Sequence, residues 1–375
     1  MHLDALRKVL LQYHNYILGC NANFIVRAPV VNNVDSSSFN YSVEEPILRE
    51  FGSYDIKHDY SFGIVQPCVR TRDAAHIFDD ATHLSQFTIL PLPFSFFASK
   101  KTQNEKREHF LSNALCFLKN LGLDISRLYV TYFPGAFFDS IVNSFSHVYI
   151  EPDLITRNVC LDAGIDERNL MTGDPFDNFL CTSPFSQKFY AGYRYEIFYK
   201  ARTGHMFEIA TGETLLWLQE TVDSRTELLE MPGFGLVIGL GLERFLMAYE
   251  NKETIAESSI IAPLLAVLQQ HHINIPLMEA FSFVDSLRAL QIIIFDGVGY
   301  SQLNRHQRNH VRVFLRRIAI IMHKYSISKE ILSEILELNA EIQFWIENMS
   351  LCIEEVVHEI EQYCHRASCI RADVL

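Results

Sequence analysis

GLVIGLGLERFLMAY, residues 235–249, is the stretch of sequence that best indicates the fold. It begins with an apolar run typical of a buried strand, continues through Gly239 and Gly241, and ends as an apolar helix. Arg244 stands in the first turn of that predicted helix. Because glycine permits close backbone approach and a guanidinium binds phosphate with paired donors, this arrangement indicates a nucleotide-phosphate site.

Two segments earlier in the chain strengthen this interpretation. QPCVR, residues 66–70, ends a predicted strand on Arg70, and DATHLSQF, residues 80–87, leads into another strand. A strand, an arginine, a loop and a second strand, followed later by Gly-x-Gly-x-x-Arg, resemble motifs two and three of class II aminoacyl-tRNA synthetases. The resemblance implies the antiparallel sheet flanked by helices that such enzymes use for adenylation.

The pattern of predicted elements independently favours the α+β class. An amphipathic helix opens the chain over residues 3–17, and two further helices are predicted over 105–121 and 153–163. Short strands that are mostly adjacent in sequence favour an antiparallel sheet with helices packed against it. The predicted strands cover residues 24–30, 64–70, 87–90, 128–132, 148–151, 195–199, 207–209 and 236–238.

Within class II, the sequence is most similar to alanyl-tRNA synthetases, in order over most of the chain. FSF at 94–96 resembles the end of that family's motif two, and EIFY at 196–199 equals its Glu-Ile-Phe-Tyr. LRA at 287–289 and LRRI at 315–318 resemble the helical domain that grips the tRNA acceptor stem. We therefore expect an alanyl-tRNA synthetase-like paralogue that lacks the family's editing and C-terminal domains.

The resemblance also implies which residues bind ATP and Mg²⁺, the two cofactors that we expect. In class II synthetases the motif two arginine binds the α-phosphate, the motif three arginine binds the γ-phosphate, and an acidic residue on an intervening strand binds Mg²⁺. The corresponding catalytic residues here are Arg70, Arg244 and Glu208, with Glu208 as the metal ligand. Phe87 either stacks on adenine or belongs to the core. The predicted ATP site is completed by Gly239 and Gly241.

The amino-acid site departs from the alanyl family at one position. Where that family has an aspartate that holds the ammonium group of alanine, this sequence has Val237. A buried ammonium needs an anionic partner, so Glu213 or Asp177 could replace the aspartate, or the amino acid differs in size or charge. The predicted amino-acid contacts are Asp177, Glu213, Val237 and Gly239.

The second part of the chain has a different texture. Strand patterns almost stop after Glu250, which predicts a catalytic domain over 1–250 and a helical domain over 251–375. Residues 297–328 contain no acidic residue, and spacings of four place several arginines on one helix face that suits a phosphate backbone. A salt-bridged face packed against acidic helices is the alternative. The predicted contacts with the tRNA acceptor stem are Arg305, Arg308, Arg312 and Arg316.

Composition restricts the class of protein. The chain has 375 residues, 49% of them hydrophobic, and a formal net charge of −13, so we expect a folded protein rather than a generic polyanion binder. The longest apolar runs are far shorter than the roughly 20 residues of a membrane helix. The amphipathic N-terminus has no signal-peptide pattern. We expect a cytoplasmic protein with no membrane partner and leave its oligomeric state open.

Three functions are compatible with these patterns. The first is ATP-dependent activation of an amino acid as an aminoacyl-adenylate, with transfer to tRNA. The second keeps the adenylation and passes the acyl group to a carrier protein or a small molecule in a biosynthetic pathway. The third is a non-catalytic paralogue that binds tRNA or a protein, which Val237 favours and Arg70, Glu208 and Arg244 disfavour.

Overall fold

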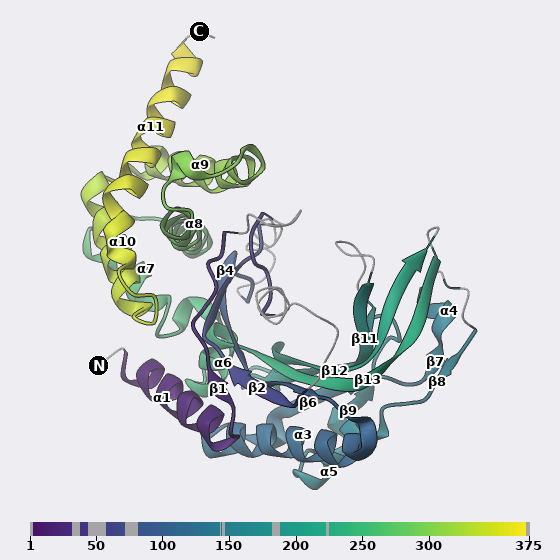
Figure 1. Cartoon of the computed structure of the whole chain (residues 1–375). Helices are drawn as coiled ribbons and strands as arrows, with labels where there is room; N and C mark the ends of the chain where they lie inside the picture. The colour runs from purple at the N-terminus through teal and green to yellow at the C-terminus, as the bar shows by residue number, and fades with distance from the viewer. Residues whose placement is uncertain are drawn as a thin grey trace.

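The computed structural model describes residues 3–31, 38–43, 58–71, 82–142, 144, 147–181, 188–222 and 225–372 (Figure 1). The strands are short in the first half of the chain and long in the segment 188–241. They are β1 Asn23–Phe24, β2 Tyr60–Gly63, β3 Gln66–Val69, β4 Gln86–Pro91, β5 Phe94–Phe97, β6 Leu128–Tyr132, β7 Ala136–Phe137, β8 Tyr149–Ile150, β9 Leu170–Thr172, β10 Phe179–Cys181, β11 Lys188–Lys200, β12 Met206–Val222 and β13 Arg225–Gly241.

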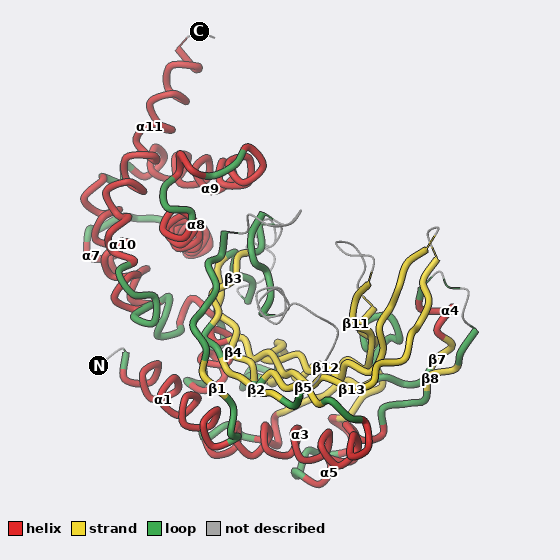
Figure 2. The backbone as a smooth tube through the Cα atoms, in the orientation of Figure 1, coloured by secondary structure: helices red, strands yellow, loops and turns green. Residues whose placement is uncertain are grey.

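Helices precede, interrupt and follow these strands (Figure 2). The helices are α1 Asp4–Gly19, α3 Gln103–Asn120, α4 Phe138–Ile141, α5 Leu154–Asp162, α6 Leu242–Tyr249, α7 Ala262–Gln270, α8 Leu277–Asp296, α9 Arg305–Tyr325, α10 Lys329–Ile342 and α11 Ile353–Ala372. The three helices predicted before residue 250 correspond to α1, α3 and α5.

One large sheet organises the first part of the molecule. Its order is β1-β2-β5-β13-β12-β11-β6-β9, with β4 pairing β13 and β3, and with β10 pairing β11. Only β1 with β2 and β6 with β9 pair in parallel in this sheet, among the residues that the structure describes. The predicted α+β class, with a mostly antiparallel sheet flanked by helices and a helical C-terminal part, is confirmed.

Helices α1, α3 and α5 cover one face of the sheet and leave the other face to the cavity described below (Figure 1). Apolar side chains spaced along α1 enter this core, among them Leu6, Tyr13 and Ile17. The buried hydroxyl of Tyr13 donates to the carbonyls of Ile64 and Pro91, at 3.0 and 2.9 Å. The first helix is therefore tied to the strands that surround motif two.

From residue 250 to residue 372 the described chain forms helices and no strands. One hydrophobic cluster nevertheless includes Leu10 of α1, Leu240 of β13, Leu287 of α8 and Leu336 of α10. The two parts thus share a core, and the division into domains at residue 250 stays a prediction. Of the helices within the described ranges, none is both long and apolar enough to cross a membrane.

A buried ion pair joins the two parts. Arg288 of α8 is fully buried, and its Nη2 lies 3.2 Å from a carboxylate oxygen of Glu243 in α6. Its Nη1 donates to the carbonyl of Gln86 in β4 at 3.2 Å, and the backbone N–H of Thr88 donates to Glu243 at 2.9 Å. Asp285 of α8 accepts from the backbone N–H of Ser85 in the same region. Helix α8 is thereby bound to β4 and α6 together.

The predicted strand over 24–30 is wrong beyond Phe24. The N–H of Ile25 still donates to the carbonyl of Gly63 in β2, but further along the segment the N–H of Ala28 donates to the side chain of Gln66 and the N–H of Val30 to that of Asp296. The Arg27 guanidinium also binds both carboxylate oxygens of Asp296, at 2.7 and 2.8 Å. Hydrogen bonds to these distant side chains replace the hydrogen bonds of a β-ladder. A local sequence pattern cannot predict such partners.

The buried pair yields a test of stability. Arg288→Met leaves the Glu243 charge buried without its cation, which typically costs about 3–5 kcal/mol of unfolding free energy. The urea midpoint should fall accordingly. Arg312→Met, which removes an exposed arginine of α9, is the matched control and should stay within about 0.5 kcal/mol. An Arg288→Met protein as stable as the control would show that the pair does not stabilise the junction.

Candidate functional site

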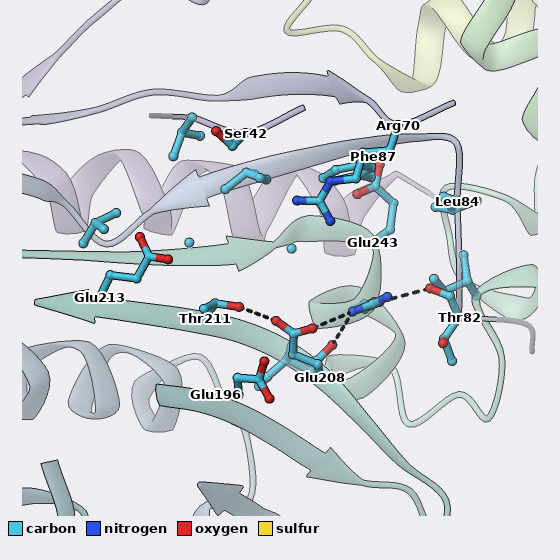
Figure 3. A pocket seen from close by; sticks show the side chains of 18 of the residues that line it. Ser42, Arg70, Thr82, Leu84, Phe87, Glu196, Glu208, Thr211, Glu213 and Glu243 are labelled. Carbon is cyan, nitrogen blue, oxygen red and sulfur yellow. Dashed lines mark hydrogen bonds and ion pairs between the residues drawn. The ribbon is translucent and has the colours of Figure 1, made fainter. Parts of the chain in front are cut away.

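A cavity of about 240 Å³ lies on the face of the sheet opposite α1, α3 and α5 (Figure 3). It is formed by motif two, by strands β11 to β13 and by the start of α6. It brings together the predicted ATP-site residues and three of the four predicted amino-acid contacts, Glu213, Val237 and Gly239. The charged lining residues are Arg70, Arg194, Glu196, Glu208, Glu213, Glu243 and Arg244. The predicted uncharged residues that line it are Phe87, Val237, Gly239 and Gly241.

Strand register arranges the cavity wall in rows. Arg194 of β11 is paired with Glu213 of β12, and Glu213 is paired with Val237 of β13. In the next row along the strands, Glu196 pairs with Thr211, and Thr211 pairs with Gly239. Because side chains two residues apart on a strand share a face, both rows face the cavity.

The glycines of motif three leave room for a ligand. Gly239 and Gly241 both have negative φ, so their backbone conformation does not require glycine. A Cβ on Gly239 would meet Ile89 Cγ2 at 3.3 Å, and a Cβ on Gly241 would approach only the carbonyl of Ile209, at 3.8 Å. Their lack of side chains therefore keeps this part of the cavity open.

A β-bulge positions Glu208. Along β12 the register passes from Ala210 opposite Ile197 to Glu208 opposite Phe198, so Ile209 is the extra residue. Bulges redirect side chains at functional sites, and here both Glu208 and Ile209 line the cavity. One carboxylate oxygen of Glu208 accepts a short hydrogen bond from Thr211. The other lies 3.2 Å from Nη1 of Arg244.

Arg244 and Arg70 reach the cavity from different elements. Arg244, in the first turn of α6, also donates from Nε to the carbonyl of Thr82 at 3.0 Å. Arg70, directly after β3, lies over the ring of Phe87 with its guanidinium carbon 4.7 Å from the ring centre. Its Nε donates to the carbonyl of Tyr41 at 3.1 Å. Two guanidinium groups therefore flank the cavity, one on each side of the Phe87 strand.

Sequence reasoning missed the role of Glu196. Its carboxylate lies beside that of Glu208 in Figure 3. Burial raises the pKa of Glu196 above that of an ordinary glutamate, the charge of Glu208 raises it further, and Arg194 partly lowers it. The sequence did single out the EIFY segment, and Glu196 is its first residue. Only the structure shows that Glu196 lines the cavity. Two neighbouring carboxylates in a cavity that also contains two arginines are an arrangement that fits Mg²⁺, which is usually bound by one or two carboxylates together with substrate phosphates. Within the described ranges, no group of three or more His, Cys, Asp or Glu residues could hold a metal by itself.

The amino-acid contacts predicted from the sequence lie in different places. Glu213 is buried in the cavity wall and Val237 is buried next to it. Asp177 is exposed and does not line the cavity, although its charge contributes to the raised pKa of Glu196. Of the two predicted replacements for the missing aspartate, Glu213 is therefore the one inside the site. Residues 72–81, which include the start of the DATH segment, lie outside the described residues.

The predicted tRNA contacts lie on α9. Arg305, Arg312 and Arg316 are exposed, and none of them forms an ion pair with a residue in the described ranges. Arg308 is partly buried and donates to the carbonyl of Leu303. Two residues further along α9, His310 Nδ1 lies 3.2 Å from the hydroxyl of Thr71, the residue after Arg70. The basic helix thus adjoins motif two.

Comparison with known proteins finds weak structural likenesses. No protein-family model matches the sequence. The structure is similar to the RNA-binding domain of threonyl-tRNA synthetase from Cryptosporidium parvum Iowa II, at 12% identity and a TM-score of 0.41 over 68% of this chain and 65% of that one. It is also similar to pyrrolysyl-tRNA synthetase from Desulfitobacterium hafniense, at 10% identity and a TM-score of 0.37 over 68% and 72% of the two chains. Neither likeness identifies an amino acid or shows an activity, and alanyl specificity stays a prediction.

The raised pKa of Glu196 predicts how Mg²⁺ binding depends on pH. Protons compete with Mg²⁺ for a carboxylate, so Mg²⁺-dependent ATP binding should weaken as the pH falls through this raised pKa, at a higher pH than for an ordinary glutamate. Glu196→Gln should lower Mg²⁺ affinity about tenfold and remove this part of the pH dependence. Titration calorimetry with ATP at several Mg²⁺ concentrations measures both.

The control variant is Glu227→Gln, which alters an exposed glutamate of β13 outside the cavity. It should bind Mg²⁺ and ATP like the unaltered protein. If the Glu196→Gln profile instead matched the control at every pH, Glu196 would have no part in metal binding.

Proposed function

We propose that this protein activates an amino acid with ATP and Mg²⁺, forms an aminoacyl-adenylate, and transfers the acyl group to a tRNA. The observation that carries the proposal is the meeting of Arg70, Arg244, Glu196 and Glu208 around one cavity with a glycine-lined wall. Two cations and two carboxylates in this setting suit a nucleotide triphosphate and its metal.

The residues present fit the chemistry of adenylation. The carboxylate of the amino acid attacks the α-phosphorus of ATP, the bond to pyrophosphate breaks, and negative charge spreads over the phosphate oxygens. Arg70 would hold the α-phosphate and Arg244 the γ-phosphate, so that both guanidinium groups stabilise the charge in the transition state. Glu208, with Glu196 beside it, would hold Mg²⁺, which neutralises the phosphate oxygens when bound. No side-chain nucleophile is needed.

Phe87 would bind the base of ATP. Its ring is partly buried and one face of it lies against Arg70. An aromatic ring on the strand between the two arginines offers a stacking surface for adenine, and the arginine adds a cation–π contribution. Gly239 and Gly241, on the neighbouring strand, would leave the space that the ribose and the phosphates require.

The tRNA step rests on α9. Arg305, Arg312 and Arg316 are exposed there, in a segment without acidic residues, in a chain whose formal net charge is −13. A local row of guanidinium groups binds a phosphate backbone even when the whole protein is acidic. The contact between His310 and Thr71 joins this helix to the residue that follows Arg70. An acceptor stem on α9 would therefore have its end near the adenylate.

The first experiment is amino-acid-dependent exchange of pyrophosphate into ATP. It would screen the standard amino acids and β-alanine in the absence of tRNA. Exchange with one amino acid would support adenylation and identify the substrate. The absence of exchange with every one of them would contradict amino-acid activation and favour a non-catalytic paralogue. Exchange without transfer to tRNA would instead favour a carrier protein or a small molecule as the acceptor.

Arg244→Ala should reduce the exchange rate by about 100-fold or more, because one charge contact is lost in the transition state. The matched control is Arg168→Ala, which removes an exposed arginine paired with Asp166 outside the cavity. It should exchange at the unaltered rate. Full activity in Arg244→Ala would exclude the γ-phosphate role of this residue.

Charge reversal on α9 tests the tRNA step. Substituting glutamate at Arg305, Arg308, Arg312 and Arg316 should weaken tRNA binding and reduce its salt dependence by about one unit of log–log slope per lost phosphate contact. Filter binding at several salt concentrations measures this effect, and pyrophosphate exchange should continue. Reversing Lys8 and Lys119, which are exposed on α1 and α3 on the opposite side of the sheet, is the control. Equal tRNA affinity in the two reversed proteins would mean that α9 is not the binding face.

A further inference from the structure

One end of the cavity contains a buried carboxylate that is only half satisfied. The side chain of Glu213 is 7% exposed, and its Oε1 lies 3.4 Å from Nε of Arg194. Its Oε2 is buried and has no hydrogen-bond partner among the described residues. The Nε of Arg194 is also buried, and its contact with Glu213 lacks hydrogen-bond geometry. The two side chains are thus a loose ion pair with an unused acceptor.

An unused acceptor of this kind is costly unless a ligand completes it. A buried charged oxygen without a donor loses its hydration and receives nothing in exchange. Val43, Ile89 and Val237, which line the same cavity, are apolar and offer Oε2 no donor. A protonated amine fits best, since it has three donors and a compact positive charge. Glu213 can accept it through Oε2 while Oε1 stays with Arg194.

The walls around this carboxylate limit the rest of the ligand. Val43 and Val237 belong to an apolar cluster with Phe62, Phe94 and Phe96, all of them buried. Val43 and Val237 bring this cluster to the cavity wall, and Val237 is the strand partner of Glu213. A long side chain would collide with it, and a charged side chain would lose its hydration against it. Arg194, the remaining charge at this end, is already engaged by Glu213 and acts on the pKa of Glu196.

We propose that Glu213 binds the amino group of the substrate and that Arg194 positions the carboxylate of Glu213. The substrate is then an amino acid with a short, uncharged side chain. This inference rests on the proposed adenylation and names the substrate class of the same site. The resemblance to alanyl-tRNA synthetases predicts the amino-group carboxylate on β13, at the position of Val237. The carboxylate of Glu213 lies on β12 instead. Glu213 and Val237 are directly paired across the two strands, so the two positions are neighbours in the sheet.

The test compares KM values in pyrophosphate exchange, with the amino acid that the unaltered protein uses. Glu213→Gln keeps the shape of the side chain and removes its charge, so KM for the amino acid should rise about 100-fold. KM for ATP should not change, which also shows that the variant is folded. The analogue in which a hydroxyl replaces the amine should be a poor substrate of the unaltered protein, and Glu213→Gln should discriminate against it much less.

Arg194 is tested as a positioning residue. Arg194→Met should raise KM for the amino acid about tenfold, the effect of one lost charged contact, without changing KM for ATP. Arg194→Lys, which retains a cation, should recover most of this loss. A merely structural role would move both KM values together, and the lysine variant would then give no selective recovery.

The outcomes separate this inference from the proposed function. If the unaltered protein exchanges pyrophosphate but Glu213→Gln keeps its KM for the amino acid, the anchor is wrong and adenylation stands. A preference for an acidic, basic or bulky amino acid would overturn the substrate class in the same way. If the unaltered protein exchanges with no amino acid, adenylation itself fails. Glu227→Gln, the exposed glutamate variant, should match the unaltered protein in every assay.

Discussion

The fully buried charge of Arg288 is the constraint on which the arrangement of the site depends. A guanidinium without water needs a counter-ion, and Glu243 of α6 provides it, together with the Gln86 carbonyl of β4. Glu243 precedes Arg244 in α6. The ion pair between Arg288 and Glu243 therefore fixes α8 against the helix that carries Arg244. Burial raises the pKa of Glu243, and the neighbouring Arg288 opposes that rise. The helical part of the chain is therefore a component of the site as well as a neighbour of it.

Strand pairing in the sheet also arranges the site. It brings residues that are far apart in the sequence into rows across the cavity wall. Arg194, Glu213 and Val237 lie on three strands, yet they form one row at the end proposed for the amino acid. Glu208, displaced by its bulge, and Arg244 lie at the end proposed for the phosphates. Both arginines and glutamates line this wall, so the cavity can accommodate both the cationic and the anionic groups of the proposed substrates. The basic helix α9 lies next to the cavity-lining Arg70, because His310 contacts Thr71, the residue after Arg70.

Comparing prediction with structure shows which signals were local. The apolar spacing of α1 and the strand, glycine and helix pattern of residues 235–249 were predicted correctly, because their periodicity is written in neighbouring residues. The extended segment after Phe24 was predicted as a strand but bonds to Gln66 and Asp296, which are remote in sequence. Glu196 was read as part of a matching segment without a role. Its importance depends on Glu208, and a bulge in the next strand brings the two carboxylates together.

The sequence by itself determined the class of fold, the two arginines and the glycines of the candidate nucleotide site, and the basic face of α9, since each depends on residue type and short spacing. Tertiary structure alone decided between Glu213 and Asp177 as the carboxylate inside the cavity, and it alone revealed Arg194, Glu196 and the Arg288–Glu243 pair. The physical reason is that strand register, burial and the neutralisation of buried charge are properties of pairs of residues. Such pairs are remote in the chain, and only folding brings them into contact.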